Sequence, residues 1–443
     1  MTDTIIAEIV KKDMDRKRAY QENLDFYNGH QWTRATKKQR QLTFNYAKVF
    51  IDKITSYLIT DTVFAVDPTG DTDQAVQTAA AAEKAISKVA IDNNLEELDY
   101  NTETDAAILG DGCYKVTWDI VNKRVRITAP DVQGIYAWWQ PDDPSRVYQV
   151  ASRYQIPDSS WITEVWTDKT LYIYHNEQLT LARGNPYGFI PFIIFPNLRQ
   201  PKQFWGLSDI PDIKTTQQEL NRALSQVSTI LELSGNPITV LENVEQAEDI
   251  AVQPGAVWEL PEKAKAYLLD LLQGGGLRLH IDYIDLLYRI LHDTSESPKA
   301  AYGRTERDLS GVALEIEMQP ILQKVRRKRL IRTTVYRKRN QMILSLLKTF
   351  TGQDLTNVSH RVAWGSVLPQ DQGRAVQNET ALVLNGIHCR RTAMDTLGVT
   401  DPEAEFKRWI EEREQILQQN QNHSAKAKGI KRESEATSQS VEE

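Results

Sequence analysis

Two aspartates are the first residues whose types could support catalysis. Asp111 and Asp119 could form a carboxylate pair that binds a divalent metal, as in nucleotide-transferring enzymes. They flank one expected strand, residues 114–118, and no third ligand lies near them in the sequence. A metal-dependent DNA-processing enzyme is therefore retained only as an alternative interpretation.

Other patterns typical of catalytic or cofactor sites are missing. Gly110-Asp111-Gly112 is not part of a G-x-x-x-x-G-K-[ST] or G-x-G-x-x-G loop, so it favours a tight turn before a strand. No serine lies in a G-x-S-x-G elbow, and His280 and His292 are expected on an exposed helix face. The sequence predicts no catalytic residue, no cofactor and no metal site.

A dense basic stretch is the best candidate for contact with nucleic acid. Residues 318–353 contain ten Lys or Arg and no acid, whereas residues 236–262 contain six acids and no base. Such segregation indicates two surfaces with different partners. The basic side chains are too dense for one helical face and could pair with adjacent subunits or contact DNA; the candidates are Lys324, Arg326, Arg327, Lys328, Arg329 and Arg332.

The composition is that of a soluble globular protein with about three domains. The net charge of −7 over 443 residues argues against a protein that simply coats a duplex. Cys113 and Cys389 lie far apart, so neither a disulfide framework nor a zinc site is expected. Apolar runs are too short to span a membrane.

These residues are expected to be positioned by an α+β, mainly helical fold. Apolar spacing predicts helices over residues 46–58, 207–234 and 277–293. A segment rich in alanine, the best helix former, predicts another over residues 73–93. A long helix is expected over residues 309–350, bent at Pro320. Residues 1–32 are expected to form a charged helical arm, and two or three helices should follow Asp371. Alternating runs predict antiparallel strands over residues 114–118, 125–128 and 171–174.

The order of these elements resembles the portal proteins of tailed double-stranded DNA phages, in particular the branch typical of long-tailed phages. No segment is specific alone, but together they span residues 20–415. The similar segments are YNGHQ (27–31), NYAK (45–48), IDK (51–53), YL (57–58), NPYGFIPF (185–192), PN (196–197), GLSDI (206–210), ELNRALS (219–225), SP (297–298), Gly303, SGVAL (310–314), PILQKV (320–325) and DPEAE (401–405).

The resemblance implies a portal fold that assembles as a ring, usually of twelve subunits. The expected regions are the wing (1–205), a stem helix (206–235), the clip (236–272), a second stem helix (273–294), a tunnel loop (295–311), a long kinked helix that returns to the wing (312–369), the crown (370–417) and a disordered tail (418–443).

The resemblance also implies the function. Such a ring sits at one vertex of the virion capsid and is assembled in the host bacterial cytoplasm. Double-stranded DNA passes through it, without sequence specificity, during packaging and ejection. The implied partners are other copies of the chain, the large terminase subunit, head–tail connector or adaptor proteins, and scaffolding and major capsid proteins, with no membrane and no enzymatic activity. Another ring or connector protein of the virion is the second alternative.

The resemblance assigns candidate residues to two further surfaces. Mixed charge in the tunnel loop would centre the DNA without holding it, through Lys299, Arg304 and Arg307 opposed by Glu306 and Asp308. A surface that neutralises 6–10 phosphates binds tightly at low salt, roughly 10³–10⁵ more tightly than at high salt, so most basic side chains of the long helix are expected to pair with protein. The docking residues expected in the clip are Glu242, Glu245, Glu248, Asp249 and Glu259.

Overall fold

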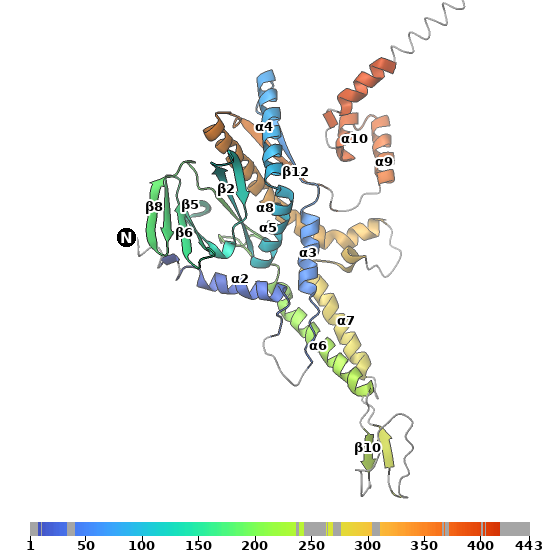
Figure 1. Ribbon diagram of the computed structural model, residues 1–443. Coiled ribbons are helices and arrows are strands. Elements are labelled where there is room, and N and C mark those ends of the chain that lie inside the picture. The colour runs from blue at the N-terminus through green and yellow to red at the C-terminus, as the bar shows by residue number, and fades with distance from the viewer. Residues whose placement is uncertain are drawn as a thin grey trace, which may run out of the picture. The chain divides into compact units, whose positions relative to one another are not determined.

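The computed structural model divides the chain into two units, Met1–Trp364 and Gly365–Glu443 (Figure 1). The two units are treated separately below. The residues that the structure describes are 8–9, 11–32, 40–235, 239–242, 263, 265–268, 276–303, 311–365, 367, 372–399, 402–403 and 405–416.

Helices predominate in the described part of the first unit before residue 110, and the first of them agrees with the helical arm expected at the start of the chain. Helix α2 (Met14–Tyr27) ends at the predicted turn, where Gly29 has a φ of 93°. Helix α3 (Tyr46–Leu58) has the predicted bounds, and the Asn45 side chain accepts a hydrogen bond from the Lys48 backbone N–H. This cap satisfies one N–H at the start of the helix. Helix α4 (Asp73–Asp92) begins after a similar cap from Thr72.

A three-stranded antiparallel sheet follows helix α5 (Leu95–Leu109). Its central strand β2 (Asp111–Asp119) pairs with β3 (Arg124–Thr128) on one side and β9 (Phe192–Pro196) on the other. The two strands predicted over residues 114–118 and 125–128 are confirmed. One face of this sheet packs into an apolar core through Tyr114, Val116 and Phe195.

A five-stranded antiparallel sheet lies between β3 and β9 in the sequence. Consecutive strands are hydrogen-bonded neighbours, so the sheet is a simple meander. The strand predicted over residues 171–174 is confirmed within β7. The strands are β4 (Ile135–Gln140), β5 (Asp143–Gln155), β6 (Trp161–Trp166), β7 (Thr170–His175) and β8 (Gln178–Gly184), with the short helix η1 (Val132–Gly134) before them.

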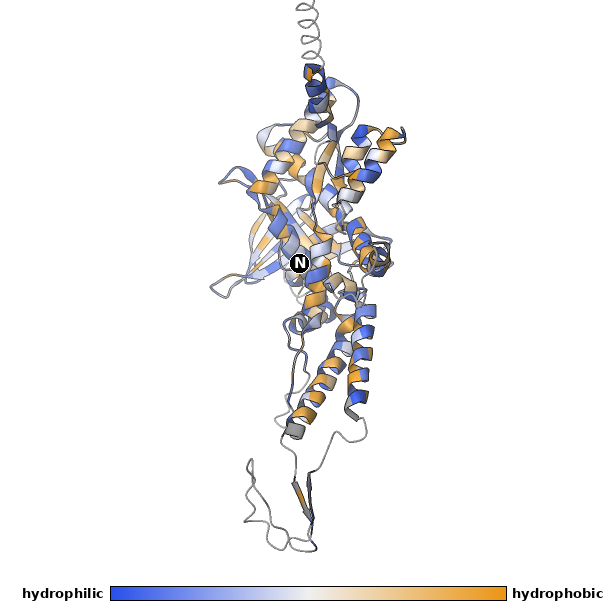
Figure 2. Cartoon of the chain, turned by 90° about the vertical axis from the view of Figure 1, so that its right-hand side faces the viewer, coloured by the Kyte–Doolittle hydropathy of each residue, from blue (hydrophilic) through white to orange (hydrophobic). Residues whose placement is uncertain are grey.

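Helices α6 (Pro211–Gly235) and α7 (Gly276–Ser295) confirm the two helices predicted from apolar spacing and pack side by side. Figure 2 shows apolar and polar residues alternating along both of them. Between them in the sequence, β10 (Thr239–Glu242) pairs antiparallel with β11 (Lys265–Leu268). Most of the acidic stretch lies outside the described residues.

A single long helix, α8 (Gly311–Thr351), contains Pro320 and confirms the helix predicted after residue 309. It contacts α3, α4, β2 and β9, so it connects much of the first unit. Its apolar residues Tyr336, Ile343 and Leu346 pack against the three-stranded sheet. Strand β12 (Val358–Ala363) then returns to pair with β1 (Val63–Pro68).

The expectation of an exposed loop over residues 295–311 is wrong at its start. Ser297 is fully buried, and η2 (Lys299–Tyr302) follows it. His292, expected on an exposed face, is also buried, because the rings of Phe50, Tyr288 and Tyr302 lie edge-on around it.

The described part of the second unit is helical. It contains α9 (Gln372–Leu384), α10 (Arg390–Thr396) and helical residues 405–416. Gly386, with a φ of 72°, lies between α9 and α10 as the sequence predicted. No helix in the described ranges has both the length and the apolar character needed to cross a membrane.

Candidate functional site

The aspartate pair that suggested metal chemistry cannot share a metal ion. Asp111 begins β2, is fully buried, and accepts hydrogen bonds from the Tyr20 hydroxyl and, at 2.8 Å, the Gly206 backbone N–H. Burial raises the pKa of Asp111 to about 6. Asp119 ends β2 and accepts a hydrogen bond from the Val121 backbone in its own turn.

The length of β2 places the two carboxylates too far apart to bind one metal ion. Eight residue steps along an extended strand separate the two Cα atoms by roughly 26 Å. Among the described residues, no group of three or more His, Cys, Asp or Glu side chains could hold a metal ion. The alternative interpretation of Asp111 and Asp119 as a catalytic metal pair is therefore wrong.

The basic helix α8 has a buried cationic face and an exposed cationic face. The buried cations recur four, four and seven residues apart, which keeps them on one side of a helix with 3.6 residues per turn. Arg326 and Arg327 lie on the other side and are exposed. The buried cations are Lys324, Lys328, Arg332 and Arg339, with relative exposures of 5%, 1%, 0% and 0%.

The Asp209 carboxylate forms ion pairs with the first two of these cations, Lys324 and Lys328. The Lys324 Nζ lies 3.0 Å from Asp209 Oδ1, and the Lys328 Nζ donates to Asp209 Oδ2 at 2.5 Å. Lys324 also donates to the Ser295 carbonyl at 3.0 Å. Asp209 lies just before α6 and Ser295 ends α7, so Lys324 joins both helices to α8 at one buried point.

The site contains two lysines and one carboxylate, and the pKa values of Asp209 and Lys328 are both shifted. Burial alone would raise the pKa of Asp209, but Lys324 and Lys328 lower it well below its ordinary range. Burial, together with Lys324 and Arg332, lowers the pKa of Lys328 to about 8, although Asp209 acts in the opposite direction.

Arg332 binds Glu103 of α5 in a bidentate arrangement. Its Nε donates to Oε1 at 2.8 Å and its Nη2 donates to Oε2 at 2.7 Å. Its Nη1 donates to the carbonyls of Pro196 and Asn197 at 2.9 and 2.8 Å. Burial alone would lower the pKa of Arg332, but the Glu103 carboxylate raises it above its ordinary value.

Arg339 forms the third buried pair, with Asp99 of α5. Its Nη2 donates to Asp99 Oδ2 at 3.0 Å, and the Tyr114 hydroxyl donates to Asp99 Oδ1 at 2.7 Å. The guanidinium also lies over the rings of Tyr336 and Tyr114, at 4.6 and 4.9 Å from their centroids. Helices α5 and α8 are thus joined by two buried ion pairs.

The structure corrects the expected partners of Lys324, Lys328 and Arg332. Each is buried and paired with an acid of the same chain, so neither an adjacent subunit nor DNA is needed to satisfy it. The acids were missed because Asp209 and Glu103 lie more than 100 residues away in the sequence. The sequence did contain one signal for these acidic partners: Asp99 and Glu103 are four residues apart, so both can lie on one face of a helix.

The other three predicted residues of α8 lie nearer the surface. Arg327 binds both carboxylate oxygens of Glu296, at 2.6 and 2.7 Å. Arg329 donates to the carbonyl of Tyr57 at 3.1 Å and lies over the Trp364 ring. Arg326 is exposed.

The tunnel-loop and clip residues are only partly described. The Lys299 Nζ lies 5.1 Å from the centre of the Tyr288 ring, and Glu242 accepts a hydrogen bond from the Tyr267 hydroxyl at 3.1 Å. The remaining residues of both groups lie outside the described residues: Arg304, Glu306, Arg307 and Asp308 of the loop, and Glu245, Glu248, Asp249 and Glu259 of the clip.

Comparison with known proteins identifies the family. None of the curated proteins compared with the chain matches it. The sequence model of the family described as "Phage portal protein, SPP1 Gp6-like" matches residues 6–419 of the 443, and so covers both units and all of the ion pairs of α8. The chain therefore belongs to the SPP1 Gp6-like family of phage portal proteins.

Proposed function

We propose that this chain is one subunit of a ring at the portal vertex, through which double-stranded DNA enters the procapsid and later leaves. Membership of the portal family makes the chain a structural virion component and not an enzyme. The match over residues 6–419 favours a portal subunit over another ring or connector protein.

The observation that supports ring formation most directly is a second apolar stripe on α7. One face of the helix, with Leu287 and Leu291, is buried against the rest of the chain. A different set of apolar side chains remains exposed at intervals of four, three and four residues. This set is Leu279, Tyr283, Leu286 and Ile290, with relative exposures of 72%, 40%, 44% and 37%.

Spacing of this kind is typical of a seam that packs against a neighbouring helix. An apolar side chain of this size contributes about 1.5–3 kcal/mol when it moves from water into full apolar contact. Four such side chains on one helix face therefore favour association with another copy. On α6, Leu231 is 52% exposed and offers an apolar side chain near the end of that helix. Closure around a central axis would produce a ring, usually of twelve subunits.

The regions expected from the sequence remain part of the proposal. Helices α6 and α7 would form the stem, and β10 and β11 would belong to the clip. Residues 1–205 would form the wing, α8 would return to it, and the second unit would contain the crown. Mixed charge in residues 295–311 would line the path of the DNA, with Lys299, Arg304 and Arg307 as the cations.

The acidic stretch supports a docking role for the clip. Residues 236–262 carry six acids and no base, so a basic surface on a terminase subunit or a head–tail connector would complement them. The proposed docking residues are Glu242, Glu245, Glu248, Asp249 and Glu259. Scaffolding and major capsid proteins would contact other parts of the ring.

Negative-stain microscopy with native mass spectrometry tests ring formation. The purified chain should form closed rings with a central hole. The double variant Leu286→Asp/Ile290→Asp should give folded monomers, whereas the matched control Asp285→Asn on the same helix should still form rings. Monodisperse wild-type monomers at high concentration, or rings of the double variant, would contradict the proposal.

A further inference from the structure

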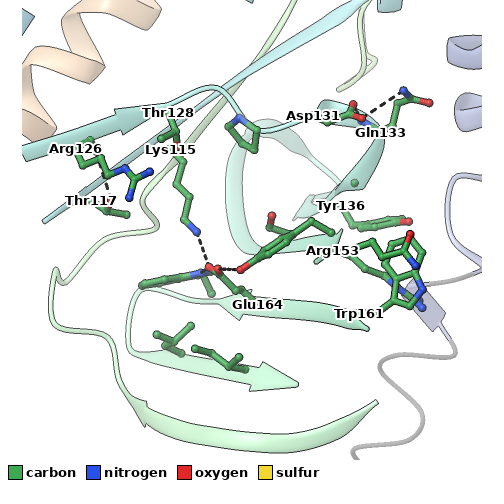
Figure 3. Close-up of a pocket in the computed structure, with 18 of the residues that line it drawn as sticks. Lys115, Thr117, Arg126, Thr128, Asp131, Gln133, Tyr136, Arg153, Trp161 and Glu164 are labelled. Atoms are coloured by element: carbon green, nitrogen blue, oxygen red, sulfur yellow. Dashed lines mark hydrogen bonds and ion pairs between the residues drawn. The ribbon is translucent and has the colours of Figure 1, made fainter. Parts of the chain in front are cut away.

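The first unit contains a cavity of about 1020 Å³ that the portal role does not explain. Side chains from both sheets line it, together with Lys17 of α2 (Figure 3). Strands β2 and β3 contribute one wall, and β4 to β8 contribute most of the rest. Its volume is at the upper end of the range for small-molecule and cofactor pockets, about 300–1,000 Å³.

The lining is cationic in excess. Among the described residues that line the cavity, five carry a formal positive charge and two carry a negative charge. The cations come from five different elements of the fold, so their charges are spread around the cavity. They are Lys17, Lys115, Arg126, Arg153 and Arg183, and the acids are Asp131 and Glu164.

The most buried of the charged groups compensate each other. Glu164 accepts hydrogen bonds from Lys115 at 2.6 Å, Trp166 at 2.9 Å and Tyr154 at 3.1 Å. Burial alone would raise the pKa of Glu164, but Lys115 and these hydrogen bonds lower it. Figure 3 shows the Lys115 side chain reaching toward Glu164. The positive charge of Lys115 is therefore compensated by Glu164 within the cavity wall.

Two cations of the lining, Arg126 and Arg183, have no such compensation within the described part of the chain. Arg126 on β3 and Arg183 on β8 are exposed, and neither has an ion-pair partner within the described part of the chain. Arg153 lies over the Trp161 ring at 4.8 Å, with Glu177 at 4.0 Å. Lys17 donates to the Tyr136 hydroxyl at 3.2 Å. The two uncompensated charges of the cavity lining are thus both on exposed arginines.

Apolar and aromatic surface accompanies these charges. Tyr154 and Trp161 are 42% and 40% exposed, a large fraction for rings of this size inside a hollow. Leu171, Ile173 and Tyr187 add apolar lining on the side of β7 and the segment after β8. A ligand that fits would combine negative charge with at least one apolar group.

We propose that this cavity is a binding site for an acidic peptide segment of a partner protein. The segment would place carboxylates on Arg126 and Arg183 and an apolar side chain against Tyr154 and Trp161. Arginine binds carboxylates through paired hydrogen bonds. A single phosphate group is compact and is bound by several donors that point to one place. The cations of this cavity come from several elements, and such an arrangement suits the spaced carboxylates of a peptide better.

The edge of β3 excludes binding by strand addition at this wall. The Asn93 side chain accepts a hydrogen bond from the Ile127 N–H at 2.9 Å and donates to the Val125 carbonyl at 3.0 Å. These are the backbone groups that an added strand would use. The peptide is therefore recognised through the side chains of the cavity, and loss of those side chains should abolish binding.

A peptide-display selection on the full-length chain tests the proposal. Peptides with two or more Asp or Glu around an apolar residue should be enriched. Anisotropy of a fluorescein-labelled selected peptide should show at least about tenfold weaker binding to Arg126→Gln/Arg183→Gln. The control Arg146→Gln changes an exposed arginine of β5 that does not line the cavity, and its binding should match the wild type.

Competition distinguishes other anions. Pyrophosphate and a 12-nucleotide single strand should displace the labelled peptide weakly or not at all. Absence of acidic enrichment, or equal binding by the double variant and the control, would overturn the proposal. Tight binding of the nucleic acid or of pyrophosphate that depends on Arg126 and Arg183, without peptide binding, would also overturn it. The substituted arginines are exposed, and matching circular dichroism spectra would verify folding.

Discussion

The guanidinium of Arg332 and the carboxylate of Glu103 form a bidentate ion pair that solvent does not reach, with side-chain exposures of 0% and 1%. Removal of one partner leaves an uncompensated buried charge, whereas replacement of both by apolar groups of similar volume is often neutral. The pair joins α5 to α8, and its loss should therefore be measurable as loss of stability of the first unit.

Glu103→Gln should lower the free energy of unfolding by about 3–5 kcal/mol, because Arg332 would remain charged and buried. Thermal and urea unfolding of the purified chain measure the change. The control Arg327→Gln removes a pair with Glu296 whose side chains are 49% and 36% exposed, and it should cost about 1 kcal/mol or less. Equal effects of the two substitutions would contradict the importance of burial.

Asp209→Asn should be more destabilising than Lys328→Met. The first change leaves two buried lysines with no carboxylate, while the second leaves Asp209 paired with Lys324 at 3.0 Å. We expect a loss of about 3–5 kcal/mol for Asp209→Asn and a smaller loss for Lys328→Met. Urea unfolding at pH 7 compares them, and the reverse order of stability would refute this account of the triad.

The pH dependence of the free energy of unfolding should show the contribution of Lys328. Its pKa falls from an ordinary 10.5 to about 8 on folding, so between these values the unfolded state binds more protons. The free energy of unfolding then rises with pH. Relative to Lys328→Met, the wild type should gain about 1.6 kcal/mol between pH 8 and pH 9.5. Parallel pH curves for these two proteins would contradict the expectation, and the exposed control Lys348→Met should follow the wild type.

Gly206→Ala should destabilise the first unit. An added Cβ would lie 2.4 Å from the Gly110 carbonyl oxygen and 2.5 Å from the Pro196 Cβ. The segment around Gly206 would have to move, at a cost of about 1–3 kcal/mol, and the hydrogen bond from Gly206 to Asp111 would be strained. Gly70→Ala, where no atom lies within 4 Å of the new Cβ, is the control. Equal melting temperatures for the two variants would be the contrary result.

Charge reversal in the proposed tunnel loop should affect DNA and leave assembly intact. Arg304→Glu/Arg307→Glu is expected to form normal rings by microscopy but to reduce packaged DNA, measured as nuclease-protected DNA per capsid. The repulsion of the phosphates by added carboxylates is the physical reason. Normal packaging by rings of this variant would show that the loop charges do not act on DNA.

Local pattern predicted most of the helices but missed α5, since no helix was expected over residues 95–109. The apolar spacing over residues 46–58 gave the bounds of α3 because the same spacing determines which side faces the core, and Asn45 caps its start. The strands over residues 114–118, 125–128 and 171–174 were also correct. Their pairing into two separate sheets was not predicted, since register depends on contacts between distant segments.

Burial of charge was the main feature that local pattern could not predict. The sequence indicated only that the cations of α8 were too dense for one face. Which of them would be buried depends on Asp99, Glu103 and Asp209, and these acids lie 115–240 residues away from their partners. His292 was assigned to a solvated face for the same reason, because Phe50 lies far from it in the sequence.

Lys324 has a mechanical consequence for α6 and α7. The same ammonium group binds Asp209, just before α6, and the Ser295 carbonyl, at the end of α7. If either helix slid along its axis without the other, one of these contacts would break in a site closed to water. An axial load on the two helices is therefore transmitted to α8 at one buried site, through Lys324 and Lys328, and α6 and α7 should move together under force.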